Sequence, residues 1–216
     1  MKCPSISLDQ NIEKPHDIIM RIICLDLEGV LIPEVWIALS HKLNISELMQ
    51  TTRDIPDYNQ LMNYRLDILN RNNVRIHHIT ELVATMKPLE GAREFLSRAR
   101  MFGQPIILSD TFEEFIMPLI SMLGNPLILC NNLHIDNTGV IQSYHIRQKE
   151  GKQHAVRALQ DLKYFVTSIG DSYNDLSMLR AANQGILFRP PLAIKKRTEF
   201  PVVTTYQQLL SLIEHP

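Results

Sequence analysis

The sequence predicts an α/β fold in which a doubly wound parallel sheet has helices on both faces and a small helical cap is inserted after the first strand. From residue 88 onward, short apolar runs alternate with amphipathic stretches of helical length, whereas residues 34–87 show helical patterns and no strand pattern. Alternating strands and helices favour a parallel sheet between two helical layers. We therefore expect an N-terminal extension at residues 1–19, a core domain at 20–33 and 88–216, and a cap at 34–87.

The first strand of the core is expected at residues 18–25, because this run is short, apolar and rich in β-branched residues. Such a run is typical of a strand buried on both faces of a parallel sheet. The cap should consist of helical segments at residues 35–43, 46–49, 57–69 and 79–86. The last segment should end near Pro88, because the residue before a proline disfavours the helical conformation.

The rest of the core shows the alternation of strands and helices that defines the fold. Strands are expected at residues 105–108, 127–130, 164–169, 185–188 and 202–204. Helices are expected at residues 90–100, 112–123, 152–162, 177–182 and 206–213. A hairpin at residues 134–148 should turn at the Asp-Asn-Thr-Gly sequence of residues 136–139, since these residue types favour turns.

Length, charge and cysteine content narrow the class of protein. The 216 residues suffice for one sizeable domain with an insertion. The 22 basic and 23 acidic residues nearly balance and form no long block of one sign, so nothing favours nucleic acid or an anionic membrane as a partner. Scattered cysteines, no secretion signal and no apolar run of membrane-spanning length predict a cytoplasmic protein. The oligomeric state stays open, and a homo-oligomer is compatible with the sequence.

Polar residues suited to phosphoryl chemistry follow the predicted strands. Asp26 ends the first apolar run, Ser109 ends the second, and Asp171 follows the strand at 164–169. In a parallel sheet these strand ends meet at one edge, where ligands bind. Carboxylates gathered there repel one another unless a proton or a metal ion neutralises them. The sequence therefore predicts a site that holds a divalent cation, Mg²⁺, and a phosphoryl group.

Asp26 is the candidate nucleophile and Glu28 the candidate general acid. A carboxylate can attack phosphorus and so split one difficult displacement into two easier ones. Glu28 lies two residues on, and in extended backbone its side chain projects to the same side as that of Asp26. It would then protonate the leaving oxygen. A magnesium ion held by Asp26 and Asp171 would neutralise the charge that develops.

Each of these residues also has a plain structural explanation. A lone aspartate at a strand end is usually a turn or helix cap, Ser109 can cap a helix, and Lys152 can be a solvated helix residue. Catalysis is favoured by their joint occurrence at successive strand ends of one domain. The pair His77 and His78 lacks a third ligand, and we expect Trp36 to pack in the apolar interior.

The order of these motifs resembles the haloacid dehalogenase-like phosphatases. The segments that carry the resemblance are LDLEGVL at 25–31, TTRDIPDY at 51–58, KPLEG at 87–91, ILSDTF at 107–112 and IGDSYND at 169–175. Together they look like one bacterial subfamily, the bifunctional phosphoserine phosphatases/homoserine phosphotransferases. The resemblance covers about residues 20 to 205 and implies a Rossmann-like, haloacid dehalogenase-like core.

The resemblance also implies a role for each candidate residue. Asp26 would be the phosphoaspartyl nucleophile and Glu28 the proton donor. The metal ligands would be Asp26, Asp171 and Glu28, the last through its backbone carbonyl, with Asp175 supporting the metal shell. The phosphoryl oxygens would be held by Ser109, the Asp110 backbone and Lys152, with Asn174 nearby. Glu34 would pair with a substrate ammonium and Arg65 with its carboxylate, and such a pair selects a zwitterionic amino acid.

The implied activity is hydrolysis of O-phospho-L-serine through a phosphoaspartyl intermediate, with transfer of the phosphoryl group to homoserine as a second outcome. A phosphatase for another small phosphorylated metabolite is an alternative that keeps the fold. A catalytically idle binding protein is disfavoured, because no nucleophile, metal or phosphate-binding position is lost. The sequence leaves open the physiological acceptor, the rates and the partition between hydrolysis and transfer.

Two positions depart from the pattern of the wider family. The second carboxylate is usually Asp and is Glu28 here, and the usual Ser-Gly-Gly is replaced by the Ser-Asp-Thr of residues 109–111, which adds a negative group beside the phosphoryl site. Both departures are shared with the subfamily. Relatives of this kind begin just before the first strand, where Met20 stands, so residues 1–19 are expected to be an extension or a misplaced start.

Overall fold

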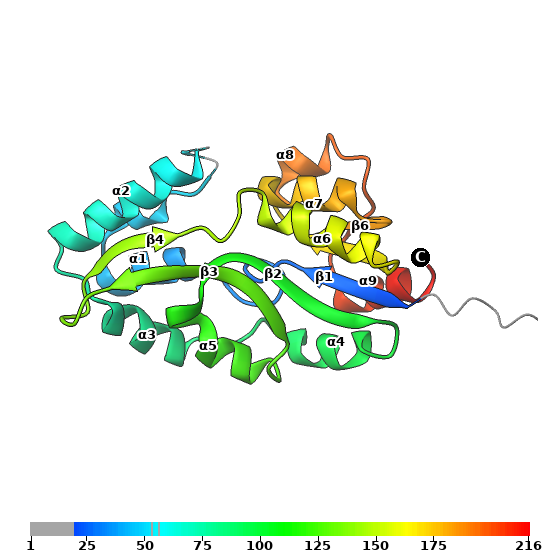
Figure 1. The fold of residues 1–216 in the computed structure, drawn as a ribbon, viewed down its shortest axis with the longest axis horizontal. Helices are drawn as coiled ribbons and strands as arrows, with labels where there is room; N and C mark the ends of the chain where they lie inside the picture. The colour runs from blue at the N-terminus through cyan, green and yellow to red at the C-terminus, as the bar shows by residue number, and fades with distance from the viewer. Residues whose placement is uncertain (1–19, 53, 56) are drawn as a thin grey trace, which may run out of the picture.

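A seven-stranded sheet forms the centre of the computed structural model, which describes residues 20–52, 54–55 and 57–216 (Figure 1). The strand order is β4-β3-β2-β1-β5-β6-β7, and all neighbours pair in parallel except β3 and β4. The strands are β1 (Arg21–Leu25), β2 (Gln104–Phe112), β3 (Leu127–Ile135), β4 (Ile141–His145), β5 (Phe165–Gly170), β6 (Gln184–Phe188) and β7 (Val202–Val203). The chain winds outward from β1 in one direction and then, from β5, in the other, which confirms the doubly wound prediction.

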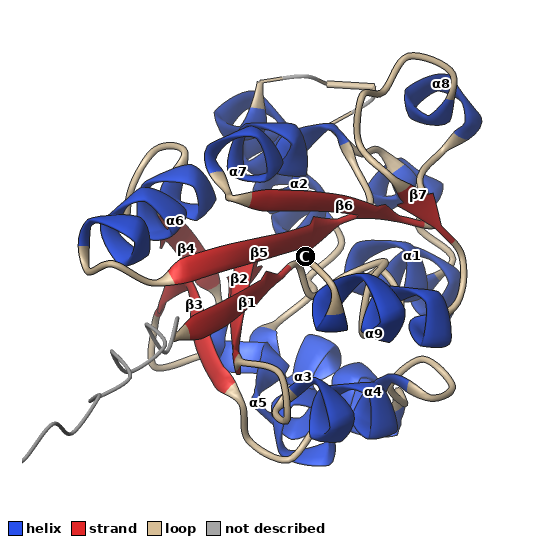
Figure 2. Cartoon of the chain, turned by 90° about the vertical axis from the view of Figure 1, so that its right-hand side faces the viewer, coloured by secondary structure: helices blue, strands red, loops and turns tan. Residues whose placement is uncertain are grey.

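Helices cover both faces of this sheet (Figure 2). The helical segments are α1 (Val35–Leu43), η1 (Ser46–Met49), α2 (Tyr58–Arg71), α3 (Ile76–Thr85), α4 (Ala92–Ala99), α5 (Glu113–Met122), α6 (Gly151–Asp161), η2 (Tyr173–Asp175), α7 (Leu176–Ala181), α8 (Leu192–Lys195) and α9 (Tyr206–Glu214), where η marks a 3₁₀ turn. Helices α6 and α7 lie on one face, and α4, α5 and α9 lie on the other (Figure 1).

The alternation of side chains along β1 explains why the sheet has an apolar core on each face. Ile22 and Cys24 belong to the cluster beneath α6 and α7, whereas Ile23 and Leu25 belong to the larger cluster on the other face. Successive side chains of a strand point to opposite faces, so a run that is apolar throughout must be buried on both. The predicted strand starts at residue 18, but residues 18 and 19 lie outside the described residues, as does the whole predicted extension at 1–19.

The segment between β1 and α4 contains α1, η1, α2 and α3, with no strand among its described residues. Helices α1 and α2 lie beyond the carboxyl end of β1, beside the end of the sheet where ligands are expected (Figure 1). The segment packs on the core through α3 against α5 and through α2 against β4. Its status as a separate cap domain at residues 34–87 stays a prediction.

Two strands extend further than the sequence predicts. Strand β2 continues past Leu108 to Phe112, and its pairing with β3 shifts register over that stretch. Irregular pairing of this kind occurs next to active sites, where it redirects a side chain. Strand β3 continues past Cys130 and forms the predicted hairpin with β4, whose turn is closed by backbone N–H groups that donate to the Asp136 carboxylate. In the part of the chain that the structure describes, no helix has the length and hydropathy of a membrane span.

Candidate active site

Asp26 is the first residue after β1, and it is fixed from two sides. Its backbone N–H donates to the carbonyl of Ile169 at 2.9 Å, which continues the pairing with β5. Its carboxylate Oδ1 accepts from the Leu27 N–H and from the Lys152 ammonium, each at 2.8 Å. Burial raises the pKa of Asp26, the Asp175 charge raises it further, and Lys152 opposes both. A buried carboxylate in this position needs a cation beside it in order to stay ionised.

The loop after β5 is organised around Asp175, whose side chain is fully buried. One of its oxygens accepts from the Asp171 and Ser172 N–H groups and from the Ser172 hydroxyl, and the other accepts from Lys152 at 2.8 Å. A Cβ on Gly170 would lie 2.3 Å from the Cβ of Asp175, so this strand end requires glycine. The loop is therefore a fixed scaffold that carries Asp171 to the strand ends.

Three carboxylates meet where a metal ion would fit. Asp26, Asp171 and Asp175 each contribute an oxygen, and the three oxygens lie within 4.8 Å of one another. An all-oxygen set of carboxylates suits Mg²⁺. Because both oxygens of Asp175 are already engaged, Asp26 and Asp171 are the members best placed to ligate directly. Gly29 lies against this group with φ +77°, and a Cβ there would meet Asp171 Oδ2 at 2.6 Å.

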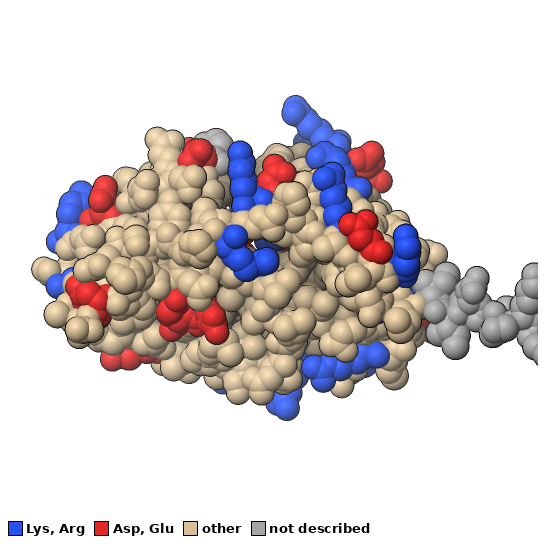
Figure 3. Space-filling view, in the orientation of Figure 1, with Lys and Arg blue, Asp and Glu red and all other residues tan. Residues whose placement is uncertain are grey.

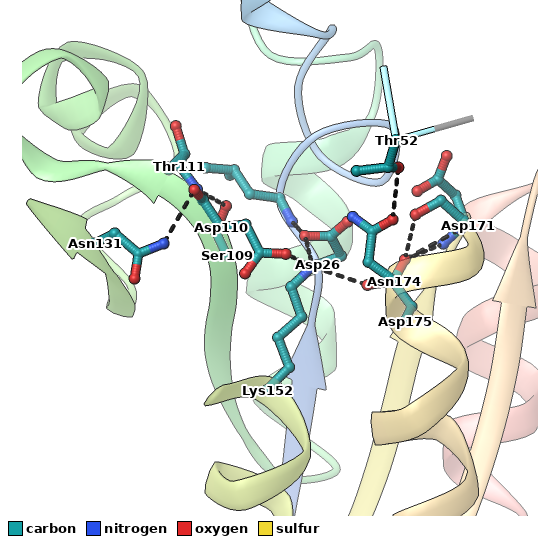
Figure 4. A network of polar contacts seen from close by, with 12 residues as sticks. Asp26, Thr52, Ser109, Asp110, Thr111, Asn131, Lys152, Asp171, Asn174 and Asp175 are labelled. Atoms are coloured by element: carbon teal, nitrogen blue, oxygen red, sulfur yellow. Dashed lines mark hydrogen bonds and ion pairs between the residues drawn. The ribbon is translucent and has the colours of Figure 1, made fainter. Parts of the chain in front are cut away.

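Lys152 connects the carboxylates from the opposite side (Figure 4). It is the second residue of α6, is buried, and its ammonium lies 2.8 Å from Asp26, 2.8 Å from Asp175 and 3.6 Å from Asp110. Burial alone would lower the pKa of Lys152, but the carboxylates outweigh that cost and raise it. The residue is thus a fixed positive charge, which is the property a phosphoryl group requires.

Ser109 and Asp110 lie in the irregular end of β2, facing this cluster. The Asp110 carbonyl accepts from the Tyr58 hydroxyl at 2.8 Å and from the Asn131 amide at 3.2 Å. Tyr58 opens α2, so the first of these bonds joins the helical insertion to the core. A second such link runs from the Thr52 hydroxyl to the Asn174 amide oxygen at 3.2 Å, and Figure 4 shows it above the carboxylates.

A second set of charged groups combines Glu28, from the loop after β1, with Glu34 and Arg65 of the insertion. The pKa of Glu28 is raised to about 8, mainly by burial and further by repulsion from Glu34 and a hydrogen bond with it, whereas Arg65 opposes the shift. The Arg65 guanidinium lies 4.4 Å from the ring centre of Trp36, and its Nη2 donates to the Gln50 carbonyl at 3.0 Å. Trp36 is buried in the apolar core, as the sequence predicts, and its ring also packs against the Arg65 guanidinium.

These groups surround one cavity of about 120 Å³. The predicted residues that line it are Asp26, Glu28, Glu34, Arg65, Ser109, Asp110, Lys152, Asp171 and Asn174. Asp175 is fully buried and is not among the lining residues, and its support of a metal shell stays a prediction. A larger open groove of about 800 Å³ lies beside the start of α4, but it contains none of the predicted residues. Lysine and arginine are interspersed with acidic residues on the face shown in Figure 3.

The sequence did not predict a place in the site for several residues at the cavity. Trp36, Thr52 and Tyr58 line the cavity, and Asn131 holds the Asp110 carbonyl. Each acts through a residue between 21 and 122 positions away, or through a stacking contact. No spacing rule links such partners, although Tyr58 and Thr52 do fall within the TTRDIPDY segment that carries the resemblance.

The doubly wound sheet and the carboxylate cluster agree with the family that comparison with known proteins identifies. The model of the haloacid dehalogenase-like hydrolases matches residues 20–183, and the chain belongs to this family. It is 50% identical over 191 residues to the phosphoserine phosphatase ThrH of Pseudomonas aeruginosa, and the match covers 88% of this chain and 93% of that one. It is 48% identical over 191 residues to a phosphoserine phosphatase of Pseudomonas syringae, covering 88% and 81%.

Solved structures with low sequence identity share the fold. A phosphoserine phosphatase trapped as a phosphoaspartyl intermediate analogue superposes with a TM-score of 0.75 at 15% identity, covering 89% of this chain and 98% of that one. A phosphoserine phosphatase in its apo form gives a TM-score of 0.73 at 18% identity, with the same coverage of 89% and 98%. At these identities the likeness establishes the architecture alone.

Proposed function

We propose that this protein is a Mg²⁺-dependent phosphoserine phosphatase that forms a phosphoaspartyl intermediate and also transfers the phosphoryl group to homoserine. The observation that carries the proposal is that Asp26, Lys152 and Asp171 line the same cavity as Glu34 and Arg65. The first three residues suit a phosphoryl group, and the pair suits a zwitterion. The identity to two phosphoserine phosphatases over most of both chains supports the same substrate.

In the first step the Asp26 carboxylate attacks phosphorus, and the bond between phosphorus and the serine oxygen breaks as the bond to Asp26 forms. Glu28 donates its proton to the departing serine oxygen. A pKa of about 8 keeps that proton in place at neutral pH, which is the property a general acid needs. Lys152 and Ser109 hold the phosphoryl oxygens while the bonds exchange. The contact of Lys152 with Asp26 already places its ammonium beside the nucleophile.

In the second step an acceptor hydroxyl attacks the phosphoryl group on Asp26 and gives its proton to Glu28. Water as acceptor yields phosphate, and homoserine yields phosphohomoserine; both restore the Asp26 carboxylate and the protonated Glu28. Asp26, Asp171 and the backbone of Glu28 would hold Mg²⁺, which when bound screens the repulsion between the carboxylate and the phosphoryl group. Homoserine shares the ammonium and carboxylate of serine, so Glu34 and Arg65 would hold either amino acid.

The direct test follows phosphate and phosphohomoserine from O-phospho-L-serine with Mg²⁺, with and without homoserine. We expect phosphate release that requires Mg²⁺, and formation of phosphohomoserine at the expense of phosphate when homoserine is added. A panel of other phosphate esters serves as the control. Faster turnover of an ester that lacks the amino-acid zwitterion would assign the site to another metabolite, and no turnover of any ester would exclude a phosphatase.

A further inference from the structure

The Arg65 guanidinium is held on several sides although it is buried. Its face lies 4.4 Å from the centre of the Trp36 ring, its Nη2 donates to the Gln50 carbonyl at 3.0 Å, and its Nη1 lies 3.8 Å from the Met62 sulfur. The Nε–H donor is buried and finds no acceptor among the described residues. A buried donor without a partner is costly, so this edge of the guanidinium is suited to an incoming acceptor.

Arg65 lies near two carboxyl groups without forming an ion pair with either. Glu28 and Glu34 both act electrostatically on Arg65, yet within the described chain no ion pair of 4 Å or less joins Arg65 to either of them. A guanidinium left free to move would swing onto one of these carboxylates, since a buried charge seeks a counter-charge. The contacts with Trp36 and the Gln50 carbonyl therefore keep Arg65 apart from its own carboxyl neighbours.

Trp36 is well placed to act as that restraint. It is the second residue of α1, only 7% exposed, and it lines the same cavity as Glu34, which precedes the helix. The start of α1 thus provides both Glu34, for the substrate ammonium, and the aromatic ring that packs against Arg65, the residue for the substrate carboxylate. An aromatic face attracts a cation most strongly where water is excluded, as it is here.

We propose that Trp36 is a positioning residue that selects substrates with a free carboxylate, by holding Arg65 in its carboxylate-binding orientation. The proposal rests on the function proposed above, and it assigns a role to a side chain that touches Arg65 and need not touch the reacting atoms. Trp36 is also the only tryptophan in the chain, so all tryptophan emission comes from the ring that contacts Arg65.

The kinetic test compares two substrates that differ only in the carboxylate, O-phosphoserine and O-phosphoethanolamine. In Trp36→Leu we expect kcat/KM for phosphoserine to fall about 10-fold, mainly through KM, and kcat/KM for phosphoethanolamine to change by less than about 2-fold. Trp36→Phe keeps an aromatic face and should fall between the wild type and Trp36→Leu. Tyr64→Leu is the matched control, because Tyr64 is a half-buried aromatic residue adjacent to Arg65 and outside the cavity.

A merely structural role predicts other results. Equal losses for both substrates in Trp36→Leu and Trp36→Phe would overturn the proposal. So would additivity: in an Arg65→Ala background, Trp36→Leu should cause no further loss for phosphoserine, because the residue it positions is gone. Should Trp36→Leu fail to fold, the Trp36→Phe variant and the fluorescence measurement still decide the question.

The fluorescence test needs no turnover. We expect L-serine to produce a saturable change in tryptophan emission of the full chain with Mg²⁺, ethanolamine to produce none, and Arg65→Ala to abolish the response to L-serine. An unchanged emission at saturating L-serine would contradict the proposal. If L-serine changes the emission but phosphoserine is not turned over, the proposed function is wrong and the Trp36–Arg65 assignment stands. If phosphoserine is turned over and Trp36→Leu lowers kcat/KM equally for both substrates, only the assignment is wrong.

Discussion

At the residue scale, the buried carboxyl group of Glu28 makes the stability of the fold depend on pH. Burial and the neighbouring Glu34 raise the pKa of Glu28 from 4.5 to about 8. The unfolded chain therefore loses this proton at lower pH than the folded chain does. Between about pH 4.5 and pH 8 the folded state binds more protons, so the free energy of unfolding falls as the pH rises. The raised pKa that would make Glu28 a proton donor thus weakens the fold at alkaline pH.

The first prediction follows for Glu28→Gln, which cannot ionise. In metal-free protein at pH 8 it should unfold at a higher temperature than the wild type, with a gain on the order of 1–3 kcal/mol, since one pKa unit corresponds to about 1.4 kcal/mol. The gain should shrink toward pH 5, and turnover of phosphoserine should fall sharply at every pH. Thermal unfolding across pH measures this, with the exposed Glu47→Gln as control. A gain that does not depend on pH would disprove the assignment.

A second residue-scale prediction concerns Gly29, which combines a positive φ with close contact to Asp171. In Gly29→Ala the new Cβ would meet Asp171 Oδ2 at 2.6 Å and displace that carboxylate. Loss of support around a ligand typically costs 10–100-fold in metal affinity, so we expect the Mg²⁺ concentration for half-maximal activity to rise about 10-fold or more.

The structure offers a matched control for this prediction in Gly124→Ala. Gly124 has φ +86°, close to the φ +77° of Gly29, but nothing lies within 4 Å of a Cβ there. Both variants therefore carry the same backbone strain, of about 1 kcal/mol, and only one carries the clash. An equal Mg²⁺ requirement in the two variants would mean that Asp171 does not serve as a metal ligand.

At the scale of elements, α2 contacts the core through two tyrosine hydroxyls with different positions. Tyr58, at its start, donates to the Asp110 carbonyl beside the cavity, whereas Tyr144 of β4 donates to Asn59 outside it. We predict that Tyr58→Phe raises KM for phosphoserine roughly 3- to 10-fold, the value of about one hydrogen bond. Tyr144→Phe should leave KM within about 2-fold. Steady-state kinetics of the two variants would refute the link if both gave the same KM.

The predictability of the elements followed the physical origin of each one. Strand β1 was predictable because its apolar residues must be buried on both faces, whatever their neighbours. The continuation of β2 through Ser109 to Phe112 was not, since it depends on irregular pairing with β3 that tertiary contacts impose. Helix α8 and the turn η2 are one turn or less and leave no periodic pattern. The local sequence pattern therefore predicts elements whose burial depends on their own residues, and it does not predict those that depend on tertiary contacts.

For the whole molecule, the winding of the chain explains why a site spread over 150 residues was foreseeable. Asp26 follows β1, Asp171 follows β5, and Ser109 lies at the end of β2; these strands are adjacent in the sheet. The sequence therefore predicted which charged residues would meet. The stacking of Trp36 on Arg65 joins two helices whose relative packing is not encoded by any short motif. That contact required the structure.

The measurement that tests the central claim most directly is to stop the enzyme in acid during turnover of O-phospho-L-serine with Mg²⁺ and to locate the phosphoryl group by peptide mass spectrometry. The proposed function predicts one phosphoryl group on the peptide that contains Asp26, lost on treatment with hydroxylamine and absent from Asp26→Asn, which should fold normally and lose at least about 10³-fold in turnover. A phosphoryl group on any other residue, or undiminished turnover in Asp26→Asn, would contradict it.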